Sequence, residues 1–172
     1  MTLHSFRENG LLALETERLV LREQSPAAAA VLAEGGTAGL DWLDAAPGSG
    51  TQIAGKMVAM AAEAGAYLPG WGLFAIQRAT DGVTLGGIGF HGPPSDGSVE
   101  IGYDLTESAR GAGWATDAVL ALTRWTLQLP AVHTIVAMTD PGNLASQQVL
   151  RRAGFVRLAD VDGLWAYELT GD

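Results

Sequence analysis

The chain has 172 residues, of which 48% are hydrophobic and 17% charged, so it can build an apolar core and carries too little charge for a disordered chain. We therefore expect a single domain over residues 1–172. The net charge of -9 argues against a nucleic-acid partner, because clustered Lys and Arg bind phosphates, and it mildly favours a cationic substrate. The absence of cysteine excludes disulfides, thiolate metal sites and a cysteine nucleophile.

The apolar stretches are all interrupted well before the roughly 18 residues that a membrane span requires. The start, MTLHSFRENG, lacks the cationic and apolar regions of a secretion signal. These features predict a cytoplasmic protein without a membrane partner. No spacing of metal ligands is present, and we predict no metal.

The first elements along the chain are a strand and two helices. Residues 17–23 alternate apolar and polar side chains, as a half-buried strand does. Ser25 and Pro26 then open an alanine-rich helix that reaches about residue 34. Residues 35–50 are rich in Gly, Ala and Pro and are expected to form a mobile loop beside a ligand, before a helix over about 51–66.

The middle of the chain predicts an antiparallel meander. Its three strands are expected over residues 71–79, 83–91 and 98–105. Turn signals at 80–82 and 93–97 separate them.

The last part of the chain alternates helices with strands. We expect helices over 112–129 and 143–153, and strands over 132–139, 155–161 and 164–169. The first of these helices would join its flanking strands as a parallel, right-handed β-α-β crossover if both strands share a sheet. The sequence therefore predicts an α/β fold, with a mixed, twisted sheet of six to seven strands flanked by about four helices.

A glycine-rich segment, SARGAGWAT, spans residues 108–116 between a predicted strand and a predicted helix. Such a turn lets backbone N–H groups converge on a phosphate, although it could also serve packing alone. The helix N-terminus adds about half a positive charge. The segment does not match a dinucleotide-binding fingerprint, which would need Gly or Ala in place of Thr116 and an acidic residue near position 136. It does not match a Walker loop either, because the lysine of that motif is missing.

The segment resembles the acetyl-CoA signature of the GNAT acetyltransferases, R/Q-x-x-G-x-G/A, which Arg110, Gly113 and Ala115 match. Other blocks of the family follow in the expected order along most of the chain. They are residues 16–22, similar to the opening strand of the Rim-type ribosomal-protein N-terminal acetyltransferase branch, Glu100–Leu105 for the central strand, and Asn143–Phe155 for the last block. The resemblance implies a GNAT fold with a parallel strand pair splayed around the cofactor.

The resemblance also implies a mechanism, in which a neutral amine attacks the thioester directly. We predict Glu100 as the base, although its place on an alternating strand could also turn it to solvent. Many GNAT enzymes protonate the thiolate with a tyrosine, and Leu150 stands at that position here. In the Rim-type branch a serine is thought to replace it, which assigns the acid to Ser146.

The resemblance assigns the cofactor contacts to the backbone of the central strand, the glycine-rich turn and the last block. Arg110 could contact a phosphate or form a surface ion pair, Trp114 is interpreted as packing, and Asn143 could cap its helix while it holds pantetheine. The predicted acetyl-CoA contacts are Tyr103, Asp104, Leu105, Arg110, Gly111, Ala112, Gly113, Trp114, Ala115, Thr116, Asn143 and Ser146.

The acceptor predicted by resemblance is a primary amine. A protein N-terminal amino group is the first choice, and a small amine such as a polyamine, amino acid or antibiotic is the second. A non-catalytic acyl-CoA sensor and a nucleotide-binding module are the alternatives from other classes. His91 closes a predicted strand near the expected cleft and could touch the substrate, although a lone histidine is more often structural. A homodimer is compatible with the sequence.

Overall fold

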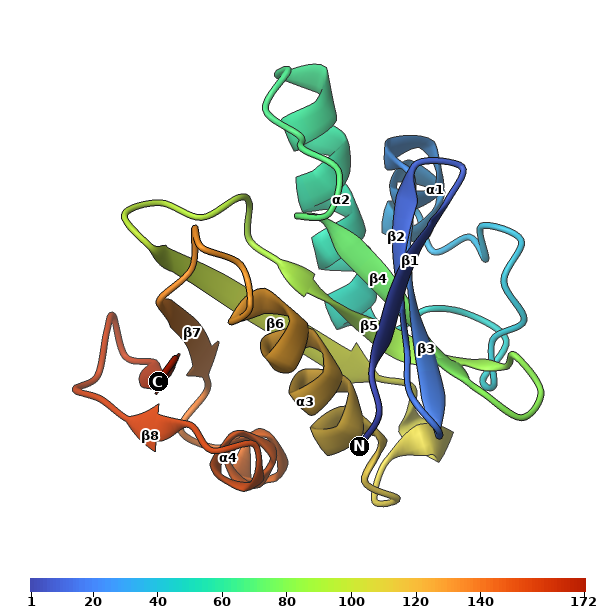
Figure 1. The fold of residues 1–172 in the computed structure, drawn as a ribbon. Helices are drawn as coiled ribbons and strands as arrows, with labels where there is room; N and C mark the ends of the chain where they lie inside the picture. The colour runs from blue at the N-terminus through green and yellow to red at the C-terminus, as the bar shows by residue number, and fades with distance from the viewer.

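The computed structural model describes residues Met1–Asp172 as one mixed sheet with helices on both faces (Figure 1). The strands are β1 (His4–Glu8), β2 (Leu11–Glu15), β3 (Leu19–Glu23), β4 (Leu73–Arg78), β5 (Thr84–Phe90), β6 (Ser98–Leu105), β7 (Thr134–Thr139), β8 (Val156–Arg157) and β9 (Trp165–Thr170). The helices are α1 (Pro26–Ala33), α2 (Ser49–Glu63), α3 (Trp114–Thr126) and α4 (Leu144–Arg152), with a 3-10 turn at Glu107–Ala109. None of these helices has both the length and the apolar character that a membrane crossing requires.

The strand order is β1-β2-β3-β4-β5-β6-β7-β9-β8, and β6 and β7 form its one parallel pair. The predicted α/β class, mixed sheet and helix number are confirmed. The sheet has nine strands rather than six to seven, because residues 4–15 add a hairpin. Its turn, Asn9-Gly10, has positive φ at both residues, as a type I′ hairpin turn requires. Every residue of β1 is exposed, so no burial pattern marks this strand in the sequence.

Two apolar cores lie on opposite faces of the sheet. The larger has 24 buried residues and joins the sheet to α3 and α4. The smaller lies under α1 and α2 and consists of Ala29, Leu32, Trp42, Val58 and Leu73. Trp42 therefore anchors the segment expected to be a mobile loop, and backbone hydrogen bonds also join Asp41 and Leu43 to Thr84. Burial of a large apolar side chain stabilises the fold by about 2 kcal/mol, which holds this segment on the sheet.

Strands β6 and β7 separate before β6 ends (Figure 1). Their pairing runs from Ser98 with Thr134 to Ile101 with Ala137, whereas β6 continues to Leu105 beside β5 alone. Backbone groups alternate in direction along a strand. Because Glu100 O and Thr106 N bond to β5, the N–H groups of Tyr103 and Leu105 point to the opposite side, into the gap between the strands.

Side chains of β6 also alternate between the two faces of the sheet. Tyr103 faces α4, where its hydroxyl contacts Ser146, whereas Asp104 faces α2 and accepts a hydrogen bond from Thr51. The gap in the sheet is therefore reached from an α4 side and from an α2 side.

Candidate active site

The turn that enters α3 presents a run of free backbone donors. We call residues Gly111–Thr116 the amide turn. None of their N–H groups has a hydrogen-bond partner, because the helical pattern begins only with Asp117 N, which donates to Gly113 O. Gly111 and Gly113 have φ of 80° and 83°, the left-handed region that glycine adopts without steric cost. The amides lie at a helix N-terminus, where the partial positive charge of the helix favours an anion.

Arg18 holds the first turn of α3 in place. Its Nη1 lies 2.5 Å from Asp117 Oδ2, and its guanidinium lies 4.3 Å from the centre of the Trp114 ring. The ion pair offsets the acidic charge of Asp117 next to the amide turn. Trp114 thus packs against the larger core, in keeping with its interpretation from the sequence, and the Arg18 guanidinium lies over its ring.

A cavity of about 300 Å³, the α4-side cavity, adjoins the amide turn. It is lined by Tyr103, Asp104, Leu105, Arg110, Ala115, Asn143, Ala145, Ser146 and Val149. Arg110 Nη2 donates to the carbonyl oxygen of Leu105 at 3.3 Å, and Arg110 forms no ion pair. The cavity thus contains most of the predicted cofactor contacts, whereas the rest of them lie on the amide turn beside it.

Two hydroxyl groups meet in the α4-side cavity. Tyr103 OH lies 2.9 Å from Ser146 Oγ. Burial raises the pKa of Tyr103 to about 12, the bond to Ser146 opposes the rise, and Tyr167 adds to it. Leu150, at the position of the family tyrosine, is fully buried in the larger core. Tyr103 and Ser146 are therefore the hydroxyl groups that face this cavity.

Asn143 caps α4, as its position in the sequence predicts. Its Oδ1 accepts a hydrogen bond from Ser146 N at 3.1 Å. The cap fixes the first turn of α4 and with it the place of Ser146 in the cavity wall. Asn143 also lines the cavity, so capping does not remove it from the surface that a ligand would meet.

Asp104 differs from its neighbours because its carboxylate faces α2 rather than the α4-side cavity. Thr51 Oγ1 donates to it, and a Cβ on Gly48 or Gly50 would lie within 2.9 Å of its side chain. Gly48 offers no side-chain cap to α2. Asp104 instead lies at the N-terminus of α2, where a negative charge is favourable, and its bond to Thr51 joins α2 to β6.

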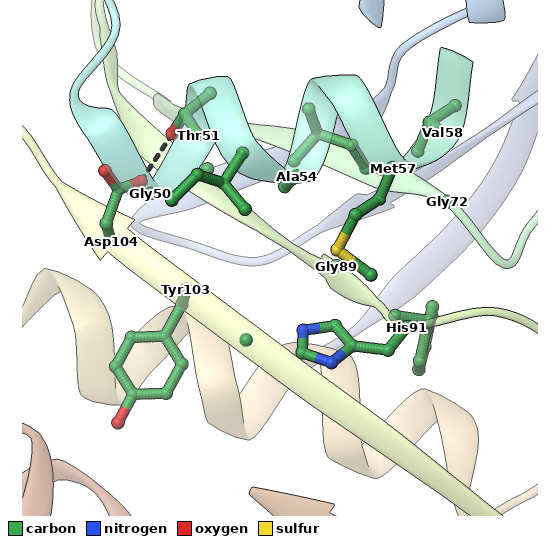
Figure 2. Close-up of a pocket in the computed structure, with 15 residues that line it drawn as sticks. Gly50, Thr51, Ala54, Met57, Val58, Gly72, Gly89, His91, Tyr103 and Asp104 are labelled. Atoms are coloured by element: carbon green, nitrogen blue, oxygen red, sulfur yellow. Dashed lines mark hydrogen bonds between the residues drawn. The ribbon is translucent and has the colours of Figure 1, made fainter. Parts of the chain in front are cut away.

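A second cavity, of about 200 Å³, lies on the α2 side of β6 (Figure 2). We call it the α2-side cavity. Its walls are Gly50, Thr51, Ile53, Ala54, Met57 and Val58 from α2, Gly72, Leu73, Gly87, Gly89, Phe90 and His91 from β4, β5 and their flanks, and Gly102, Tyr103 and Asp104 from β6. A Cβ on Gly87 would lie 2.6 Å from Thr51 Oγ1, so glycine there lets α2 approach the sheet.

An outer cavity of about 180 Å³ adjoins the α2-side cavity. Met57, Val58, Phe90 and His91 line both cavities. The outer one extends past Tyr67, Leu68 and Trp71 to Pro93. These two adjoining, mostly apolar cavities are together called the hollow, and its inner end lies at Tyr103 and Asp104 of β6.

Glu100 does not line either cavity, and its side chain is one-third exposed. Its neighbour His91 does line the α2-side cavity, and His91 Nδ1 lies 2.5 Å from Glu100 Oε2. The sequence places Glu100 on the strand next to the predicted cofactor but does not identify His91 as its partner. Side chains alternate between the two faces of β6, so Glu100 and Asp104, an even number of residues apart, could have been assigned to the same face from the sequence. That face is the one that α2 covers.

A family model described as an acetyltransferase (GNAT) domain matches residues 18–156. The chain is 37% identical over 73 residues to an uncharacterized N-acetyltransferase, YjdG, of Bacillus subtilis (strain 168). That alignment covers 42% of this chain and 44% of the relative, so the chain spans less than half of the length of the relative.

Two solved structures share the fold over nearly the whole chain. An acetyltransferase from Agrobacterium tumefaciens str. C58 is 26% identical, with a TM-score of 0.63 over 91% of this chain and 93% of that one. The ribosomal L7/L12 alpha-N-protein acetyltransferase RimL, solved with coenzyme A, is 20% identical, with a TM-score of 0.64 over 91% and 96%. The match of the family model over most of the chain, together with the splayed strand pair, shows that this protein belongs to the GNAT acetyltransferase family.

Proposed function

We propose that the protein transfers an acetyl group from acetyl-CoA to a primary amine. The observation that carries this proposal is the run of unpartnered N–H groups from Gly111 to Thr116 beside the gap between β6 and β7. Amides at a helix N-terminus suit a diphosphate, and the free N–H groups of Tyr103 and Leu105 suit a pantetheine arm and a thioester carbonyl. The solved relative that contains coenzyme A supports the same ligand.

The cofactor would extend from the amide turn along the α4-side cavity. Asn143 and Ser146 border the path of pantetheine, and Arg110 stands at the phosphate end of the cavity. Trp114 supports the amide turn from beneath through Arg18 rather than as a direct contact. Asp104 itself adds no polar group to the gap, because its carboxylate is committed to α2 and its backbone groups have the parity of Glu100 and Thr106, which face β5.

The chemistry is a direct acyl transfer. The amine nitrogen attacks the thioester carbonyl, the C–N bond forms, the C–S bond breaks, and the electron pair of that bond goes to sulfur. The N–H group of Tyr103 would stabilise the oxyanion, and Ser146 would supply the proton that the thiolate takes. Loss of the amine proton depends on Glu100, the carboxylate on the α2 side of β6. No step requires a cysteine, and the chain has none.

The acceptor enters from the α2 side, and a protein N-terminal amino group fits best. The α2-side and outer cavities share four lining residues and together reach from Tyr103 on β6 to Pro93, so the hollow can take more than a single small amine. An extended peptide advances about 3.3 Å per residue, so several residues behind the amine could lie along this hollow. Small amines would occupy only its inner end.

The test is thiol release from acetyl-CoA over a panel of acceptors. The panel should contain an amino-acid amide, tetrapeptides with free N-termini, a polyamine and an aminoglycoside. We expect thiol release that requires an amine, with kcat/KM at least tenfold higher for a tetrapeptide than for the amide of its first residue. Equal or better turnover of the short amines would replace the peptide acceptor by a small one. Coenzyme A binding without turnover on any acceptor would favour an acyl-CoA sensor, and thermal stabilisation by NAD or ATP but not by coenzyme A would favour a nucleotide-binding module.

A further inference from the structure

His91, the residue that follows β5, lies opposite Glu100 of the antiparallel strand β6. The backbone N–H of His91 donates to Glu100 O at 2.9 Å, and the side chains meet on the α2 face, where Nδ1 lies 2.5 Å from Oε2. A carboxylate oxygen can only accept a hydrogen bond, so the charge of Glu100 favours the imidazole tautomer that carries its hydrogen on the near nitrogen, Nδ1. In the neutral ring, Nδ1 therefore carries the hydrogen and Nε2 has the free electron pair.

The free nitrogen lies directly above the β6 backbone. A Cβ on Gly102 would be 2.9 Å from His91 Nε2, so the ring occupies the space that a side chain at 102 would fill. Gly102 is followed by Tyr103, whose N–H points into the gap between β6 and β7. His91 Nε2 is thus held within about one residue of the peptide group that would bind the thioester carbonyl.

The cavities distinguish the two members of the pair. His91 lines both the α2-side cavity and the outer cavity, whereas Glu100 lines neither. In Figure 2 the Met57 side chain extends from α2 toward the His91 ring, so an acceptor in the hollow would pass between them. An amine that approaches the gap from this side meets the imidazole before the carboxylate.

We infer that His91 Nε2 accepts the proton of the attacking amine and that Glu100 is the positioning residue behind it. As the C–N bond forms, the amine N–H bond breaks toward Nε2, and the electron pair of the C–S bond leaves with sulfur. Glu100 keeps the hydrogen on Nδ1 and stabilises the imidazolium that results, without itself taking the proton. This inference rests on the proposed acetyl transfer and specifies the group that takes the proton.

The test compares H91Q and E100Q with the same peptide acceptor. H91Q retains an amide that can bond to Glu100 but has no basic nitrogen, so we expect kcat to fall about 100-fold with the KM for acetyl-CoA unchanged. E100Q keeps an oxygen acceptor beside Nδ1 and loses only the negative charge, so its kcat should fall only about tenfold. H4Q, on the exposed edge strand β1, is the matched control and should retain wild-type activity.

Two further measurements separate a base from a structural side chain. Added imidazole should restore activity to H91A, in proportion to its unprotonated fraction, because the small base can enter the space that the side chain leaves. In the H91A background, E100Q should cost nothing more, since the carboxylate acts through the ring. A purely structural His91 would instead show no rescue and an additive double variant.

The results that would overturn the inference are distinct from those that would overturn acetyl transfer. If E100Q reduces kcat as much as H91Q does and imidazole restores nothing, then Glu100 is itself the base and the inference is wrong. If H91Q keeps more than a third of wild-type kcat, it is also wrong, although the acetyl transfer stands. If the wild-type protein releases no thiol with any acceptor, both the proposed function and this inference fail.

Discussion

The hydroxyl of Tyr103 on β6 lies 2.9 Å from the Oγ of Ser146 on α4, across the α4-side cavity. The two residues are far apart in the sequence, and different elements place them. The position of Ser146 follows from the cap at Asn143, whereas Tyr103 belongs to the splayed strand. One hydroxyl can polarise the other, so the pair can act as a single proton donor to a leaving thiolate.

We therefore expect Y103F and S146A to be non-additive. Each should lower kcat by about tenfold or more, with acetyl-CoA affinity within about threefold of wild type, because proton donation assists only the transition state. The double variant should be no slower than the slower single variant. Steady-state kinetics on the four proteins of the cycle measures this, and fully additive effects would show that the two hydroxyls act independently.

The pKa of Tyr103 predicts a specific alkaline behaviour. Burial raises it from 10.0 to about 12, so the folded protein keeps this proton between pH 10 and 12 while the unfolded chain releases it. The stabilisation is therefore complete below pH 10 and declines as the pH rises toward 12. Absorbance at 295 nm should show a late-ionising phenol that Y103F lacks, and urea unfolding at pH 9 and 11 should show a smaller decrease in stability for Y103F.

Tyr67 provides the internal reference for this titration. Burial, followed by the charge of Glu23, raises the pKa of Tyr67 to about 12 as well. Y103F should consequently keep the late phenol of Tyr67 and show one late phenol fewer than the wild type. Identical alkaline titrations of Y103F and the wild type would contradict the account of Tyr103.

The amide turn can be tested with a matched pair of glycines. Gly113 in this turn and Gly82 in the β4–β5 hairpin both have positive φ, at 83° and 73°, and a Cβ has no atom closer than 3.9 Å at either position. Alanine at each should cost about 1 to 2 kcal/mol of stability through left-handed strain. Only G113A should also raise the Kd for coenzyme A, by about fivefold or more, because its strain reorients the amides. Calorimetric titration distinguishes them, and equal affinities for the two variants would remove the amide turn from the binding site.

A pair of methionines on α2 tests the acceptor hollow. Met57 lines both cavities, whereas Met60 lines neither, and both are exposed, at 40% and 58%. M57A should raise the KM for a peptide acceptor about fivefold, because each Å² of apolar surface that the acceptor no longer covers costs roughly 25 cal/mol. The KM for acetyl-CoA should stay unchanged, and M60A should change neither value. A rise in the acetyl-CoA KM for M57A would mean that the hollow belongs to the cofactor.

The elements that the sequence predicts well are those whose signals are local. Gly111 and Gly113 occur at the end of a strand and the start of a helix, so their turn can be identified from a few residues. The hairpin at Asn9-Gly10 carries an equally local turn signal, but its first strand is exposed on both faces and lacks the alternation that identifies a strand.

The pairs that form the site depend on register and on distant packing. His91 faces Glu100 only because the turn between β5 and β6 sets this pairing, and a shift of one residue would turn His91 to the other face. Tyr103 meets Ser146 only after α3 and β7 have placed α4 beside β6. No spacing in the chain contains this information, so the resemblance points to Ser146, whereas its contact with Tyr103 is seen only in the structure.

The most direct test of the central claim is hydrogen exchange of the backbone amides with and without coenzyme A. If the amide turn and the gap in the sheet hold the ligand, coenzyme A should slow the exchange of Tyr103, Leu105 and residues 111–116, whose N–H groups are otherwise unpartnered. The β4–β5 hairpin around Gly82 should exchange at the same rate in both samples. Unchanged exchange over 111–116 at saturating coenzyme A would contradict the account.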